Sequence, residues 1–223
     1  MAATNLMEVR QDTLATLPDG QTPPLPFTRM GIPVYVDKWD YFALAGRMFQ
    51  VTQTTVGTPL TNQAQNAAGI VVTTPTARFD VPTGYTIFPR RFTMSFEARA
   101  GTVNEIALVT ATSASTTGGL ALTPLNMRQD QPTATIVTKA YHCSGAAITE
   151  GALTNVRFLY QSVDPLAFAA AAGFKNIEVV WKDLHPVVGP CAVLLFVGAN
   201  TTASTAVFSL EWAEVPTASV KAA

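Results

Sequence analysis

The clearest hydrophobic pattern in the chain is a strict alternation in RRFTMSFEAR, residues 90–99. Phe92, Met94, Phe96 and Ala98 fall on one side, and charged or hydroxyl residues fall on the other. A period of two is typical of a half-buried antiparallel strand, whereas a helix would distribute these side chains around its circumference. We therefore predict a strand here with one face in the core.

Two strands of different character are predicted near the C-terminus. VLLFV, residues 193–197, is apolar on both faces, and AVFSLEWAEV, residues 206–215, alternates. In the second strand Phe208, Leu210 and Trp212 are expected to point inward, and the outward positions are Ser209, Glu211 and Ala213. A fully apolar strand beside an alternating one indicates a sandwich with one sheet covered on its outer side too, and a neighbouring subunit is a candidate for that cover.

Several shorter segments complete the predicted sandwich. PVYVDKWDYF, residues 33–42, begins with a short strand, and residues 116–128 with Gly118-Gly119 are predicted to be a loop. The remaining predicted strands lie within residues 47–56, 70–74, 102–114, 134–143, 155–161 and 176–183. About eight to ten strands with turn-rich gaps predict an all-β, antiparallel β-sandwich of the jelly-roll type.

One short helix is predicted, in DPLAFAAAAGF at residues 164–174. Asp164 suits the N-cap, Pro165 the first helical position and Gly173 the end of the helix. We expect this Ala-rich segment to be the only helix of the domain.

The chain divides into three parts by composition. Residues 1–33 are predicted to form an extended, Pro-rich N-terminal arm, because prolines interrupt any regular helix or central strand there. Residues 34–216 form the sandwich, and residues 217–223 are predicted to be a flexible C-terminal tail. The arm is either a solvated terminus or a segment that docks on a neighbouring subunit. Its apolar side chains favour docking, and the candidate partner-binding residues are Leu14, Leu17, Leu25 and Phe27.

Composition and charge restrict the possible partners. Charged residues make up 13% of the chain, against about 25% in average globular proteins. The Thr- and Ser-rich faces that result suit contacts with protein, although Thr is also simply a good strand residue. The net charge is −1, and Arg10 and Arg29 are the only cations of the first thirty residues. Nucleic acid is therefore excluded as an expected partner, because binding to phosphates needs clustered cations.

Neither a signal peptide nor a membrane span is recognised in the sequence. MAATNLMEVRQDT has no apolar core, and the most apolar stretch, residues 187–199, is short and interrupted by Gly and Pro. We expect a protein that is made in the cytoplasm and has no membrane partner. Cys143 and Cys191 form no disulfide framework and are expected to be buried free thiols, with a single disulfide left open if the protein matures outside the cell.

Residues that carry chemistry are sparse. His142-Cys143 and His185 match no zinc-site spacing, and no serine nucleophile motif or phosphate-binding loop is present. The carboxylates are expected on solvated strand faces and are Glu97, Glu105, Glu178, Glu211 and Glu214. We predict no cofactor, no metal site and no enzymatic activity. The strongest charged cluster is Arg90-Arg91, which is either a contact to acidic groups of a neighbour or an exposed strand start.

Three segments carry a resemblance to a known group of proteins. GTVNEIALVTAT, TGGLALTPLNMR and VVGPCAVLLFVGANTTASTAVFSLEWAEVP resemble stretches of small structural proteins of tailed bacteriophages, which include all-β capsid decoration (cement) proteins. The likeness extends over residues 85–216. It implies a jelly-roll-like subunit, often a homotrimer, that binds the major capsid protein on the outer surface of the virion and is made in the host cytoplasm.

A second interpretation belongs to another class of function. Sandwich domains also occur as receptor- or carbohydrate-binding modules of fibres and tails. Trp39, Tyr41, Tyr85 and Tyr141 lie near predicted loops, where aromatic rings stack on sugars or cover the core.

Overall fold

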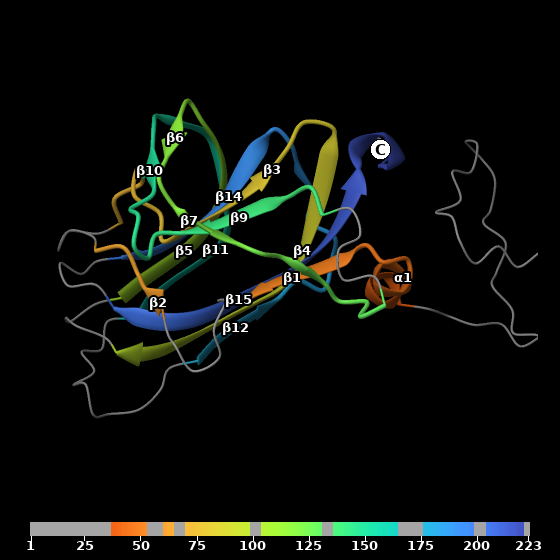
Figure 1. Cartoon of the computed structure of the whole chain (residues 1–223), viewed down its shortest axis with the longest axis horizontal. Coiled ribbons are helices and arrows are strands. Elements are labelled where there is room, and N and C mark those ends of the chain that lie inside the picture. The colour runs from red at the N-terminus through yellow and green to blue at the C-terminus, as the bar shows by residue number, and fades with distance from the viewer. Residues whose placement is uncertain are drawn as a thin grey trace, which may run out of the picture.

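The computed structural model describes residues 37–52, 60–64, 70–98, 104–130, 136–164, 176–198 and 204–220. Its long strands form two antiparallel sheets (Figure 1). One hydrophobic core receives side chains from both sheets. The prediction of an all-β antiparallel sandwich is confirmed. Among the described helices, none is long and apolar enough to cross a bilayer.

The first sheet has the order β12-β4-β15-β1-β8, with β13 added beside β4 and β2 beside β15. Its central pair is β4 (Tyr85–Ala98) and β15 (Thr205–Pro216), which run antiparallel along nearly their full lengths. The other members are β1 (Met48–Thr52), β2 (Leu60–Thr61), β8 (Leu125–Asn126), β12 (Asn176–Val180) and β13 (Val187–Val188).

The second sheet has the order β11-β5-β14-β3-β9-β7. Its strands are β3 (Ala77–Val81), β5 (Asn104–Ser113), β7 (Leu120–Leu122), β9 (Lys139–His142), β11 (Leu153–Asp164) and β14 (Cys191–Gly198). A separate two-stranded ribbon pairs β6 (Thr116–Thr117) with β10 (Thr149–Glu150).

The alternation in β4 and β15 builds the main core. Phe92 and Met94 of β4 and Phe208, Leu210 and Trp212 of β15 are all buried between the sheets, as predicted. Strand β14 is buried on both faces, also as predicted. Val193, Leu195 and Val197 enter the main core, while Ala192, Leu194 and Phe196 form a second apolar cluster with β5 on the opposite face. These outer residues are already buried in the single chain, so they need no neighbouring subunit as cover.

A helix missed by the sequence analysis covers the outer face of the first sheet. Helix α1 (Lys38–Leu44) is capped by Asp37, whose side chain accepts a hydrogen bond from the Trp39 amide at 2.8 Å. Trp39 and Phe42 pack against the sheet, and the ring of Phe42 stacks on Phe88 with 6.0 Å between centroids. The expectation of a sole helix at residues 164–174 is therefore wrong; Asp164 ends β11, and residues 165–174 lie outside the described residues.

Two further segments differ from the predictions. Residues 70–74 form no strand, because the chain turns at 72–73 and the strand begins beyond Pro75, at Ala77. The predicted loop at 116–128 contains β6, β7 and β8. Gly118 and Gly119 join β6 to β7 with φ of 78° and 90°, a conformation that favours glycine. A Cβ on Gly118 would also lie 1.9 Å from the carbonyl oxygen of Ala147.

The packed part of the chain continues past residue 216. A 3₁₀-helix, η1 (Thr217–Ser219), follows β15, and Val220 packs against the cluster under α1. The hydroxyls of Thr86 and Thr217 lie 3.0 Å apart and tie η1 to β4. Residues 217–220 are thus part of the domain rather than of a tail.

Candidate partner-binding site

An apolar hollow lies where the chain crosses from the second sheet to the first. Strand β7 is the edge of one sheet and β8 the edge of the other, and Thr123-Pro124 join them. In Figure 1 this segment runs from β7 past β1 toward α1. The hollow has a volume of about 410 Å³, and its lining comprises Ala121, Leu122, Thr123, Pro124, Leu125, Ile136, Thr138, Lys139, Ala140 and Tyr141. We call it the edge groove.

The floor of the edge groove is the sandwich core itself. Leu122 and Ala140 are buried members of the main core, and Ile136 packs against it. The rim is exposed: Leu125 keeps 56% of its surface in solvent and neighbouring Leu120 keeps 50%. Exposed apolar side chains around a hollow are typical of a surface that binds another molecule.

A buried carboxylate holds one wall of the groove in place. The two oxygens of Glu214 accept hydrogen bonds from the amides of Val137 and Thr138, each at 2.9 Å. Glu214 is 1% exposed, and its own amide donates to the Arg47 carbonyl at 2.9 Å. The wall that contains Ile136 and Thr138 is therefore fixed by charge-assisted hydrogen bonds to a central strand.

The predicted solvated positions of Glu211 and Glu214 are wrong. Both side chains are buried, as is that of the outward-predicted Ala213. Glu211 lies at a bulge: it pairs with Arg91 and Trp212 with Pro89, so Arg90 is the extra residue of β4 and both arginines lie against Glu211. Glu214 has the same parity as the core residue Trp212 and is bonded to the amides of Val137 and Thr138. Proline is tolerated in this central strand because it lies at the bulge. Beyond it, Ala213 faces the α1 cluster.

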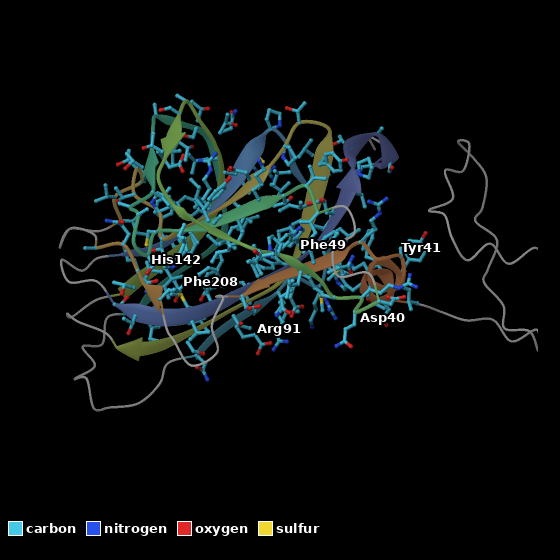
Figure 2. All side chains as sticks on the ribbon, viewed as in Figure 1. Asp40, Tyr41, Phe49, Arg91, His142 and Phe208 are labelled. Atoms are coloured by element: carbon cyan, nitrogen blue, oxygen red, sulfur yellow. The ribbon has the colours of Figure 1, made fainter. Side chains whose placement is uncertain are left out.

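Arg90 and Arg91 lie in the middle of β4 rather than at its start. Arg91 forms an ion pair with Glu178 of β12 at 2.8 Å, and its Nη1 lies 3.9 Å from Glu211. Arg90 lies 3.5 Å from the other oxygen of Glu211. Figure 2 shows Arg91 projecting from the sheet. These acidic partners come from the same chain, and the arginines are half-buried or exposed beside them.

A second charged network lies on the outer face of the second sheet, near the edge groove. Arg78 of β3 forms ion pairs with Asp80 and with Glu150, and Thr116 donates to Glu150 at 2.8 Å. Burial raises the pKa of the Asp80 carboxyl above its usual value, although Arg78 opposes the shift. The arginine thus supplies a cation to a fully buried glutamate, whose charge would be costly to bury alone.

The histidine and cysteine side chains form no reactive pair. His142 is buried in the core beside Phe208 (Figure 2), and burial lowers its pKa to about 4. Burial raises the pKa of the Cys143 thiol to about 12 and that of Cys191 to about 11, and the two are not bonded to each other. His185 is exposed. Within the described ranges, no group of three or more His, Cys, Asp or Glu side chains is placed to hold a metal ion.

A second, smaller hollow lies at the opposite edge of the sandwich. It has a volume of about 240 Å³ and lies between β11 and β13, against Trp181 and Val187. Phe158 on its rim is 61% exposed, and β11 has two register shifts along its pairing with β5. Bulges of this kind protect an edge strand from pairing with other strands.

The remaining predicted binding residues are distributed as follows. Leu14, Leu17, Leu25 and Phe27 lie outside the described residues. Trp39 of α1 is buried, whereas Tyr41 on the same helix is 38% exposed and appears with Asp40 in Figure 2. Tyr85 and Tyr141 are half-buried on different sheets, so the four aromatic residues form no single stacking platform. The edge groove was missed because its lining comes from residues predicted to be a loop and a separate strand.

Comparison with protein-family models, with curated proteins and with solved structures finds no match to this chain.

Proposed function

We propose that the protein is a jelly-roll structural subunit of a virus particle, which binds the outer capsid lattice as a decoration protein. The nested strand pairing is the observation that supports this proposal most. β1 pairs with β15, β3 with β14, β4 with β12, and β5 with β11. Among the eight described strands of five or more residues, the first thus pairs with the last, the second with the last but one, and so inward, as in one long hairpin rolled into two sheets.

The step from this fold to a particle subunit is an analogy, since jelly rolls also occur in lectins and cupins. The surface chemistry favours protein as the ligand. A sugar or metal site needs converging polar groups, and in the described part of the chain the larger hollow is lined mainly by apolar side chains. The acidic groups near it are already paired with Arg78 or with backbone amides.

Binding to a lattice would be multivalent. Each subunit contributes modest contacts through exposed apolar residues at two opposite edges of the sandwich, such as Leu125 and Phe158. In a homotrimer these contacts act together, because the first one raises the effective concentration of the others. The partner on the particle is the major capsid protein. The subunit is made in the host cytoplasm and resides on the outer capsid surface.

The experiment is immuno-electron microscopy of virus particles purified from cells that produce this protein. Antibodies raised against the purified full-length chain are expected to label the head surface in a regular array. Label confined to a fibre or tail tip would instead support the receptor- or carbohydrate-binding alternative. Particles that carry no label would contradict both. Light scattering on the purified protein checks the trimer separately.

A further inference from the structure

We propose that the edge groove binds the Pro-rich segment of the N-terminal arm, residues 22–27, whose sequence is TPPLPF. The groove and the segment agree in chemistry. Residues 20–28 contain no charged side chain, and Lys139 is the one charged residue in the groove lining. The segment would bind the groove of its own copy or of another copy of this chain. The inference therefore does not depend on the proposed role in a virus particle.

The shape of the groove suits a polyproline ligand. Prolines 23, 24 and 26 favour an extended left-handed helix, which lacks internal hydrogen bonds and needs no backbone partner from its receptor. Grooves that bind such helices are lined by aromatic and apolar side chains. Here the half-buried ring of Tyr141 and the ring of Pro124 provide that lining, above the core residues Leu122 and Ala140. In the polyproline conformation, five residues of the segment would span about 15 Å.

The groove is pre-formed, which lowers the cost of binding. Glu214 holds the backbone at Val137 and Thr138, and the Asn126 side chain donates to the Gly46 carbonyl at 2.8 Å. Both walls are therefore tied to the first sheet or to the turn that follows α1. A fixed groove and a segment whose prolines restrict φ lose little conformational entropy when they associate.

The segment can reach the groove from the start of α1. The described chain begins at Asp37, the N-cap of α1, and this helix of seven residues is about 10 Å long. At its far end the Leu44 carbonyl accepts a hydrogen bond from Arg128 at 2.8 Å, just beyond groove residue Leu125. Residues 28–36 can extend at most roughly 30 Å, so the segment can reach the near end of the groove.

Photo-crosslinking in the full-length protein tests the proposal. Leu25 is replaced by p-benzoylphenylalanine, and the linked peptides are identified by mass spectrometry. We expect the links to concentrate in residues 120–125 and 136–141. The same probe in place of Leu6, a leucine outside the segment, is the matched control and is not expected to label the groove. Links within one chain or between two copies both support the docking, and the mass of the product identifies which copy supplies the segment.

A pair of surface variants gives the second readout. Ala121→Trp fills the groove from an exposed position, and Ala152→Trp places the same bulk on an exposed alanine elsewhere. The first is expected to lower the yield of groove links about tenfold, as the loss of one well-packed contact would, and the second to leave it unchanged. Links from position 25 to the β11–β13 edge, or yields equal to the Leu6 control, would overturn the proposal. These outcomes would leave the antibody labelling of particles unaffected.

Discussion

The imidazole ring of His142 lies stacked on the phenyl ring of Phe208, with 5.6 Å between the centroids and 19° between the planes. The stack joins β9 of the second sheet to β15 of the first. The imidazole Nδ1 accepts a hydrogen bond from the Ser144 amide at 2.9 Å, while its buried Nε2 has no hydrogen-bond partner among the described residues. The ring thus serves as a neutral part of the core.

The burial of His142 predicts a loss of stability in mild acid. Its pKa falls from 6.5 to about 4 on folding, so between these values the unfolded chain binds more protons than the folded one. The stabilisation is complete above pH 6.5 and decreases as the pH falls toward 4, by roughly 3 kcal/mol in total. Urea unfolding at a series of pH values measures this dependence.

His142→Asn isolates the contribution of this residue. The amide oxygen can still accept from Ser144, but the side chain no longer titrates. We expect the variant to be less stable at pH 7, because the stack on Phe208 is lost, and to show a flatter dependence on pH between 6.5 and 4. An unchanged slope would mean that other groups, such as the buried carboxylates, cause the acid sensitivity.

The hydrogen bonds that Glu214 accepts from the amides of Val137 and Thr138 predict a large loss of stability when one of its oxygens is replaced. Glu214→Gln replaces one accepting oxygen by an NH₂ group, which then faces a backbone amide that also donates. We expect a loss of about 2–4 kcal/mol in the free energy of unfolding, measured with urea. Glu178→Gln is the matched control on an exposed pair with Arg91, and a loss of about 0.5 kcal/mol is expected there. Equal losses in the two variants would show that the hydrogen bonds of Glu214 to Val137 and Thr138 contribute little to stability.

The buried pair of Arg78 and Glu150 predicts strong coupling. Arg78→Met leaves the glutamate fully buried and without its cation, at an expected cost of about 3 kcal/mol. Adding Glu150→Gln removes the charge and keeps an acceptor for the Thr116 hydroxyl, so the double variant is expected to regain part of the loss. Unfolding free energies of the wild type, both single variants and the double variant form the cycle. Additive single effects would contradict the coupling.

The two thiols are expected to be unreactive in the folded protein. Burial raises the pKa values of Cys143 and Cys191 to about 12 and about 11, so almost no thiolate exists at pH 8. Ellman's reagent is therefore expected to react with neither cysteine until urea unfolds the chain, when both react. Rapid release of one equivalent from the native protein would indicate that the half-buried Cys191 is accessible.

The period of hydrophobic positions was sufficient to predict the strands that form the centre of the sandwich. The alternation in β4 and β15 and the two-sided apolar run of β14 each depend on burial by immediate neighbours, which local sequence records directly. Helix α1 also has a local signature, an aspartate cap followed by aromatic residues three positions apart. The pattern in PVYVDKWDYF instead predicts a short strand, and that prediction leaves no helix in this segment.

The sequence by itself determined that this protein is an antiparallel β-sandwich, because the period of hydrophobic positions reports which face of a strand is buried. Only the tertiary structure decided where the carboxylates lie, because their partners come from other strands and loops: Glu211 meets Arg90 and Arg91 at the bulge of β4, and Glu214 meets the amides of Val137 and Thr138. It also decided the edge groove. That hollow joins residues 121–125 to residues 136–141 from two sheet edges, and contacts between distant segments leave no period in a sequence.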